Sequence, residues 1–168
     1  PKKKNALTSP MYAALATALE HGESSPEIAV HVLLGQPGVF SAGNDIGEFK
    51  AYAEGGGLGP EVVRFLKCLA RLEKPLVAGV DGLALGIGTT LLLHCDLVYA
   101  SAASTFQTPF LRLGLLPEAA SSLLAPRLLG HALAFELLCL GESFSAEKAF
   151  RAGLVNDVVA AEAVDGSG

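Results

Sequence analysis

Short apolar runs alternate with amphipathic segments along this 168-residue chain, and this order constrains the fold more than any other feature. Residues 28–34 and 76–80 are apolar runs of strand length, with proline and glycine near their ends. Residues 9–22 and 60–70 repeat apolar side chains at helical spacing, and each segment has a proline at its start. Strands that alternate with helices predict an α/β domain in which helices cover a largely parallel sheet.

The remaining expected elements complete one domain. Further strands are expected at residues 96–100, 105–107 and 154–159. Further helices are expected at residues 45–52, 82–95, 131–140 and 145–152, with another that begins at Pro117. We assign residues 1–160 to a single core domain and residues 161–168 to a trailing loop.

Composition and charge exclude several classes of protein. With 51% hydrophobic and 17% charged residues, the chain has enough apolar side chains to fold. Its net charge of −5 argues against a nucleic-acid surface, which needs a basic stripe. The apolar stretch 75–100 is interrupted by Asp81, His94 and Asp96, so it predicts a buried core and no membrane span.

The cysteines and histidines predict neither a disulfide framework nor a metal site. Cys68, Cys95 and Cys139 are odd in number and lie in apolar runs, which favours buried thiols in a reducing compartment. The four histidines show no ligand spacing with cysteine or aspartate. We therefore expect a cytoplasmic protein, with a peroxisomal address left open.

Two glycine-rich segments each lie between a predicted strand and a predicted helix, where small residues let a ligand approach the backbone. The first runs from Phe40 to Ile46, and the second runs from Asp81 to Thr90. Backbone amides at a helix start favour negative charge, so two such loops side by side would supply two amides to one oxyanion. The alternative is that these glycines only permit tight turns and close packing.

Glu118 follows Pro117 in an apolar neighbourhood, at the predicted start of a helix. A glutamate in a first turn is favoured by the helix dipole without any catalytic role. A carboxylate among apolar side chains also has the chemistry of a general base. The pattern alone leaves both interpretations open.

Six segments, taken in their order along the chain, resemble the crotonase (enoyl-CoA hydratase/isomerase) superfamily. They are residues 1–7, 40–45, 80–88, 96–100, 105–110 and 153–155. The resemblance implies a ββα spiral core that binds an acyl-CoA thioester, with coenzyme A present as part of the substrate and no separate cofactor or metal. It also implies a homotrimer or a dimer of trimers.

The resemblance further assigns roles to individual residues. The backbone amides of Asn44 and Ile87 would form the oxyanion hole. Other residues would contact the thioester, the pantetheine arm or the adenosine-phosphate end of coenzyme A. These are Lys3, Ala6, Leu7, Ser41, Ala42, Gly43, Asp45, Ile46 and Gly86.

The chain departs from the hydratases of this superfamily at two positions. Where a typical hydratase carries two catalytic glutamates, this chain has Thr90 and Phe110. The segment around Glu118 instead resembles the monofunctional enoyl-CoA isomerase branch, in which one glutamate of a Pro-Glu pair is the base. The resemblance thus implies that Glu118 moves a proton from C2 to C4 of a 3-enoyl thioester.

Two alternatives stay open at this point. A hydratase, or another crotonase reaction, would need a displaced second carboxylate, for which Asp45 and Glu48 are the candidates. A non-catalytic acyl-CoA-binding module would need no base at all. Relatives usually also have preceding β-strands and a C-terminal helical region, which we expect to be missing here, leaving apolar surface exposed.

Overall fold

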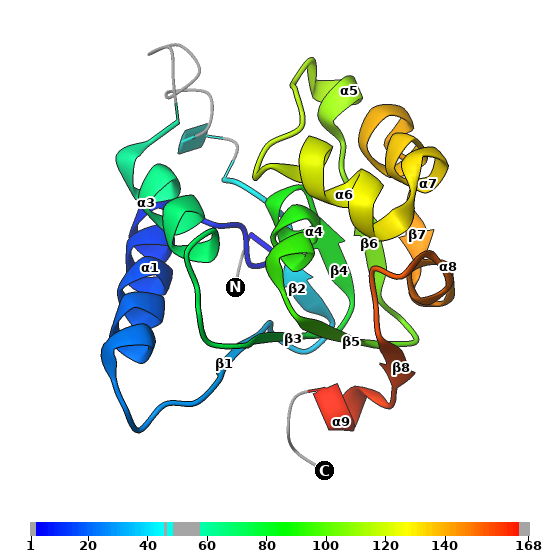
Figure 1. Ribbon diagram of the computed structural model, residues 1–168. Coiled ribbons are helices and arrows are strands. Elements are labelled where there is room, and N and C mark those ends of the chain that lie inside the picture. The colour runs from blue at the N-terminus through cyan, green and yellow to red at the C-terminus, as the bar shows by residue number, and fades with distance from the viewer. Residues whose placement is uncertain (1–2, 46, 49–57, 165–168) are drawn as a thin grey trace.

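A computed structural model describes residues 3–45, 47–48 and 58–164 (Figure 1). The first of its two sheets has four parallel strands in the order β1-β3-β5-β8. Their bounds are His31–Leu34 (β1), Leu76–Val80 (β3), Leu97–Ser101 (β5) and Asp157–Val159 (β8). The second sheet has the order β2-β4-β6-β7, and only β7 runs antiparallel to its neighbour. Its strands are Val39–Ser41 (β2), Leu83–Leu85 (β4), Thr105–Gln107 (β6) and Phe144–Ser145 (β7).

Successive strands alternate between the two sheets, and a helix follows each pair. The chain runs from β1 to β2, then from β3 to β4, and then from β5 to β6. The helices that follow these pairs are Pro60–Leu69 (α3), Ile87–Thr90 (α4) with the 3-10 turn Leu91–His94 (η1), and Phe110–Leu113 (α5). This repeat is a ββα spiral, and it confirms the α/β fold class that the sequence predicts.

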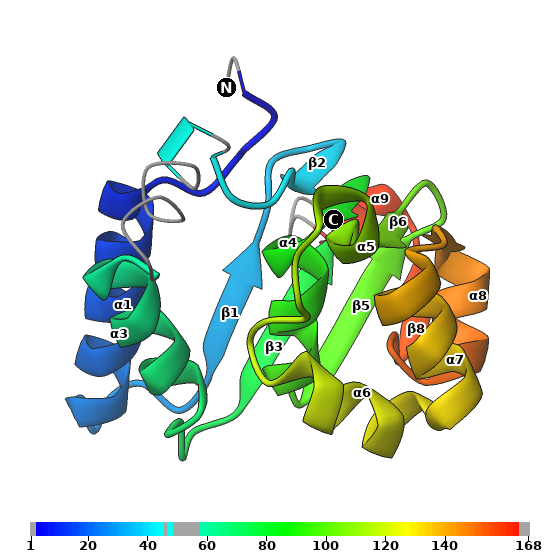
Figure 2. The ribbon, with the colours of Figure 1, turned by 90° about the horizontal axis from the view of Figure 1, so that it is seen from above.

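Two groups of helices flank the spiral. The helix Ser9–Ser24 (α1) packs against α3 because Tyr12, Ala16 and Leu19 form one buried stripe along it. A second group lies on the opposite side (Figure 2). It comprises Ser121–Leu129 (α6), His131–Phe135 (α7), the π-helical turn Glu136–Leu140 (η2) and Ala146–Ala152 (α8). Helix α4 lies centrally between these two groups in both views.

A row of buried side chains crosses the second sheet. Ala84, Phe106 and Phe144 are paired in register across β4, β6 and β7, and each is fully buried. The small Ala84 leaves room beside two rings, which is how neighbouring positions fill a core at high density. This row supports the loop that follows β4, from which α4 starts.

The structure corrects several sequence expectations. Strand β2 extends into the first glycine-rich segment, and residues 82–95, expected to be a helix, contain strand β4 before α4 begins. The helix expected to begin at Pro117 begins at Ser121, since Ala119 and Ala120 adopt positive φ. The helix expected at 131–140 divides into α7 and η2.

Three further predicted segments differ from the structure in their bounds or type. Within the expected trailing loop, residues Ala161–Val164 form a short helix (α9), and 165–168 lie outside the described residues. Of the short helix expected at 45–52, residues 47 and 48 are described and helical. The strand expected from residue 154 starts at Asp157.

The thiols are free, as predicted, but not all are buried. Cys68 and Cys95 are half-buried, whereas Cys139 is exposed because η2 directs Leu137 and Leu138 inward instead. Across the described ranges, no helix is long and apolar enough to cross a membrane. Those same residues contain no group of three or more histidine, cysteine, aspartate or glutamate side chains placed to hold a metal ion.

Candidate active site

The two glycine-rich loops predicted from the sequence lie against one another. Gly43 has φ +86°, and a Cβ atom placed on it would lie 3.0 Å from the carbonyl oxygen of Leu85. Gly88 is equally confined, because its Cβ would lie 2.9 Å from the Cβ of Ser41. Only glycine permits so close an approach of two backbones. The loop after β2 and the start of α4 therefore form a single surface.

Leu7 fixes the first loop on its other side. Its amide donates to the carbonyl oxygen of Gly43 at 2.7 Å, and its own carbonyl accepts from the amide of Asp45 at 2.9 Å. This is a two-residue parallel bridge, so the peptide groups of Asn44 itself are directed away from Leu7. The Leu7 side chain is buried in the core, while its backbone holds the loop.

Two backbone amides at this junction have no hydrogen-bond acceptor in the described part of the chain. They belong to Asn44, after Gly43, and to Ile87, after Gly86. Gly86 has φ +56° and donates its own amide to Gln107, which leaves the Ile87 amide at the very start of α4. Two neighbouring amides without acceptors are suited to hold a developing negative charge on oxygen.

Glu118 is held beside α4 by a side-chain hydrogen bond. The hydroxyl of Thr90 donates to Oε1 of Glu118 at 2.5 Å. Burial raises the pKa of Glu118 to about 7, and the Thr90 hydrogen bond acts in the opposite direction by favouring the carboxylate. A carboxyl group with this pKa is matched to proton transfer near neutral pH.

The backbone that carries Glu118 is a strained turn and not a helix start. Ala119 and Ala120 have φ of 52° and 53°, a region that alanine rarely adopts. The turn is held by Ser121, whose amide and hydroxyl both donate to the Glu118 carbonyl, at 2.9 Å and 2.6 Å. His94 adds a ring nitrogen 2.8 Å from the carbonyl oxygen of Ala119. Non-glycine residues held at positive φ concentrate at functional sites.

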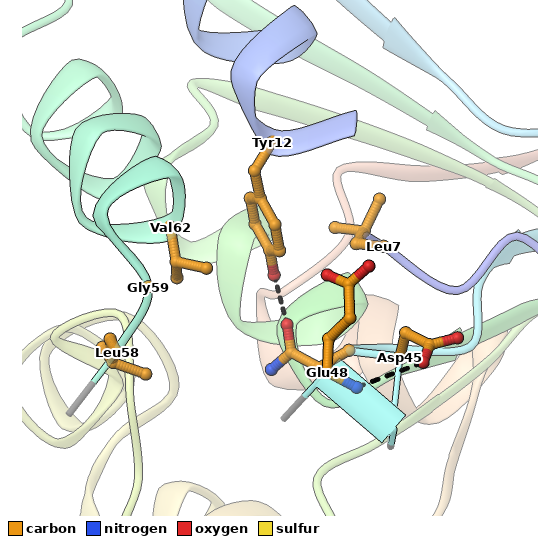
Figure 3. A pocket seen from close by; sticks show the side chains of 8 residues that line it. Leu7, Tyr12, Asp45, Glu48, Leu58, Gly59 and Val62 are labelled. Atoms are coloured by element: carbon orange, nitrogen blue, oxygen red, sulfur yellow. Dashed lines mark hydrogen bonds between the residues drawn. The ribbon is translucent and has the colours of Figure 1, made fainter. Parts of the chain in front are cut away.

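Tyr12 links α1 to the loop after β2, and no sequence pattern predicted a role for it. Its hydroxyl donates to Oδ1 of Asn44 in a small pocket lined also by Leu7, Leu58 and Val62 (Figure 3). Burial raises the pKa of the Tyr12 phenol, and the charge of Glu118 raises it further. Tyr12 occupies an ordinary position in the buried stripe of α1, so no sequence signal distinguished it.

The two candidate carboxylates for a displaced hydratase acid line the pocket beside Asn44, and each is already paired with another group. Asp45 is paired with the ammonium of Lys3 at 2.5 Å, and this hydrogen bond holds the pKa of Asp45 below its usual range. Glu48 accepts from both the amide and the hydroxyl of Ser9, each at 2.7 Å, at the start of α1. Phe110 is buried and apolar. Among the three predicted carboxylates, Glu118 is the one bonded to α4, the helix that begins at Ile87.

The residues predicted to contact coenzyme A lie along one edge of this site. The segment that contains Lys3, Ala6 and Leu7 runs beside the first loop, where the Ala42 amide donates to the Lys4 carbonyl at 3.1 Å. Ser41 is buried, and its hydroxyl donates to the Asn5 carbonyl at 3.1 Å. Ile46 lies outside the described residues.

Comparison with known proteins identifies the family. The family description "Enoyl-CoA hydratase/isomerase" matches residues 1–167 of this chain. The chain belongs to the enoyl-CoA hydratase/isomerase family. This membership agrees with the crotonase resemblance carried by the six sequence segments.

Individual members of the enoyl-CoA hydratase/isomerase family include both reaction types. Enoyl-CoA delta isomerase 2 of Rattus norvegicus is 40% identical over 163 residues, covering 94% of this chain and 41% of the rat protein. The 2,3-dehydroadipyl-CoA hydratase of Escherichia coli K12 is 35% identical over 158 residues, covering 94% of this chain and 62% of the hydratase. The chain thus spans about two fifths of the rat isomerase and under two thirds of the hydratase.

Solved structures of the family have the same fold. The crystal structure of an enoyl-CoA hydratase/isomerase from Pseudoalteromonas atlantica T6c superposes with a TM-score of 0.92 and 42% sequence identity. The match covers 99% of this chain and 66% of that structure. Both the fold class and the family predicted from the sequence are therefore confirmed.

Proposed function

We propose that this chain is the acyl-CoA-binding core of a Δ3-Δ2-enoyl-CoA isomerase. The observation that carries the proposal is the half-buried carboxyl group of Glu118, bonded to Thr90 of α4, the helix whose first amide, that of Ile87, has no acceptor in the described residues. Hydration of a 2-enoyl thioester uses acid and base help at both the α and β carbons. The positions that would supply that help hold Thr90 and the buried Phe110, which favours a reaction that needs one base.

The proposed reaction begins when the Glu118 carboxylate removes a proton from C2 of a 3-enoyl thioester. The electron pair of the broken C2–H bond forms the C1–C2 double bond of a conjugated dienolate. Negative charge moves onto the thioester oxygen, where the Asn44 and Ile87 amides donate to it. Because both donors are backbone groups fixed by neighbouring structure, they need little reorganisation as the charge develops.

The same carboxyl group completes the reaction. Glu118, now protonated, returns the proton to C4, where the C3–C4 π pair forms the new C–H bond. The C1–C2 π pair moves to C2–C3, and a lone pair on the enolate oxygen re-forms the thioester carbonyl. Atoms and electrons balance within the substrate, so we propose no metal or redox cofactor, and coenzyme A takes part only as the thioester's carrier. A pKa of about 7 suits a group that must both accept and return a proton.

We propose that the residues beside the site bind the rest of the coenzyme A thioester. Ser41, Ala42, Gly43, Asp45 and Gly86 would line the thioester and the pantetheine arm. The segment of Lys3, Ala6 and Leu7 would lie near the adenosine-phosphate end. The side chain of Lys3 is 71% exposed and pairs with Asp45, so its outer face is open to an approaching phosphate.

We also propose a homotrimer or a dimer of trimers. Large apolar side chains are exposed on α5 and in the segment after it, and Leu116 is 87% exposed. Outward-facing Val32 and Leu34 on β1 are exposed by 56% and 51%. Exposed apolar patches of this kind mark surfaces that other chains cover. Sedimentation velocity of the full-length protein tests this, and a monomer at micromolar concentration would contradict it.

The function is tested by giving the full-length protein a 3-enoyl-CoA and a 2-enoyl-CoA in parallel. We expect conversion of the first to the conjugated 2-enoyl thioester, and no hydration of the second. Glu118→Gln keeps the size of the side chain and an acceptor for Thr90, and we expect it to lower turnover by about 10²- to 10⁴-fold. The matched control is Glu27→Gln, which changes an exposed glutamate in the loop after α1.

Two results would decide against this function. Hydration of the 2-enoyl thioester that survives Glu118→Gln would indicate a hydratase with another acid, and would direct attention to Asp45 and Glu48. Tight binding of the thioester without either reaction would indicate a binding module on this fold.

A further inference from the structure

Tyr12 presents a hydroxyl whose position is set by the core of the protein. The residue is 2% exposed on α1, and its ring packs against Phe65 of α3 with centroids 5.5 Å apart at an interplanar angle of 59°. Such tilted ring pairs fix the direction of both side chains. The hydroxyl is thus a donor at a fixed place in the lining of the pocket shown in Figure 3.

The proton of this hydroxyl stays available at neutral pH. Burial raises the pKa of the Tyr12 phenol, and the negative charge of Glu118 raises it further. The phenol is therefore a permanent donor, and the acceptor it uses is Oδ1 of Asn44. A neutral phenol has a single proton to donate, so this bond commits it to Asn44.

Asn44 is consequently held from three directions by α1 and the residues that lead into it. Leu7 bonds the peptide groups on both sides of Asn44, at 2.7 Å and 2.9 Å. Tyr12 bonds the side chain. The Asn44 amide shares a planar peptide group with the Gly43 carbonyl, so the bond from Leu7 sets the direction of this amide. The bond from Tyr12 to the side chain adds a second restraint on the same residue. Without the Tyr12 bond, Leu7 alone would restrain the Asn44 amide, which has no acceptor in the described residues, and the amide would move more freely.

We propose that Tyr12 is a positioning residue, whose hydroxyl holds the Asn44 carboxamide and thereby aims the Asn44 backbone amide at the enolate oxygen. This inference rests on the proposed isomerase function for its kinetic consequence. In this role Tyr12 acts through Asn44 and does not contact the substrate. It also explains why a polar group lies inside an apolar helix stripe, where a phenylalanine would fill the same space.

Three variants separate this role from general packing. Tyr12→Phe keeps the ring against Phe65 and removes only the hydroxyl. Asn44→Ala removes the acceptor but keeps the backbone amide. Tyr99→Phe is the matched control. Tyr99 is half-buried on β5 of the first sheet, and this substitution removes the same hydroxyl group.

The kinetic test uses 3-enoyl-CoA turnover by the full-length protein. We expect Tyr12→Phe to lower kcat by about 10-fold, the equivalent of one hydrogen bond, with KM changed less than about twofold. The double variant Tyr12→Phe with Asn44→Ala should be no slower than the slower single variant, because both remove the same interaction. Tyr99→Phe should match the wild type. An unchanged kcat in Tyr12→Phe, or two losses that multiply in the double variant, would overturn the proposal.

A second measurement does not depend on turnover. Amide hydrogen exchange over residues 39–45, read by mass spectrometry, should become several-fold faster in Tyr12→Phe and stay unchanged in Tyr99→Phe. If the wild type fails to isomerise 3-enoyl-CoA, the proposed function falls, and this measurement still decides whether Tyr12 holds the loop. Unchanged exchange would overturn the inference, even with a fall in kcat, since the hydroxyl would then act on the substrate directly.

Discussion

The hydroxyl of Thr90 donates a 2.5 Å hydrogen bond to the carboxyl group of Glu118, across 28 residues of sequence. Thr90 ends α4, the same short helix whose first amide belongs to Ile87. The base and one of the two acceptor-free amides are therefore tied to a single turn of helix. Any change in how α4 sits displaces both groups together.

Replacing Thr90 should shift the pH dependence of turnover. The reaction needs the Glu118 carboxylate, so activity is expected to rise with pH through about 7. Thr90→Val removes the donor that favours the carboxylate, so the midpoint should move to higher pH, by about half a unit to one unit. Thr90→Ser keeps a hydroxyl and should leave the midpoint in place. Rate profiles from pH 5.5 to 9 measure this, and equal midpoints for Val and wild type would refute it.

Glu118 should also make the folded state less stable in alkaline solution. Its pKa is raised from 4.5 to about 7 on folding, so the folded protein binds the proton more tightly than the unfolded chain does. The resulting stabilisation is complete below pH 4.5 and is lost as the pH rises through 7. Relative to Glu118→Gln, the wild type should lose about 2 kcal/mol of unfolding free energy between pH 5 and pH 8. Urea titrations of both proteins at these two pH values provide the comparison, and parallel curves would contradict the assignment.

Gly43→Ala should separate the two loops of the site. The added methyl group would lie 3.0 Å from the Leu85 carbonyl oxygen, in a residue with φ +86°. We expect a loss of turnover of about 100-fold, because a shift of under 1 Å misplaces the Asn44 amide. Gly38→Ala is the matched control, since Gly38 has φ +76° but no atom within 4 Å of its Cβ position. Both variants should lose about 1 kcal/mol of stability from backbone strain, and only Gly43→Ala should lose the activity.

Ala120→Gly should raise the stability of the protein and lower its rate of turnover. Alanine at φ 53° is strained, and glycine relieves this strain at some cost in chain entropy, which leaves a net gain of about 0.5 kcal/mol. The looser turn should lower kcat several-fold, because Glu118 is adjacent to it. Ala102→Gly, at an exposed turn residue without positive φ, should destabilise instead. Thermal melts and turnover measured on the same preparations test both effects, and a destabilised Ala120→Gly would show that the strain argument is wrong.

Much of the fold is encoded in local pattern. Pro10 and Pro60 lie in the first turns of α1 and α3, and the strand Leu76–Val80 has its predicted bounds. Ser145 caps α8 by accepting from the Lys148 amide at 3.2 Å. Strands β2 and β4 escaped prediction because each is short and overlaps one of the two glycine-rich segments. They are strands only because β2 pairs with β4 and β4 with β6, which is information held by distant parts of the chain.

The site was predictable to the extent that it lies in glycine-rich loops. Gly43 and Gly88 signal close approach of two backbones, and the structure confirms that approach. The environment of Glu118 was less accessible, because its backbone is set by Ser121 and His94 and not by a helix start. Tyr12 could not be identified at all, since a tyrosine in an apolar stripe is ordinarily a core residue.

The three groups of the proposed site come from three successive turns of the spiral: Asn44 follows β2, Ile87 follows β4, and Glu118 follows β6 and α5. The distances between these groups therefore depend on the spacing between successive turns of the spiral, and each turn contributes one group to the proposed site. A longer loop on the side of the spiral away from the proposed site would leave this spacing unchanged. A larger side chain in place of Ala84 would push β4 away from β6 and so move the Ile87 amide relative to Glu118, with every residue of the proposed site still present.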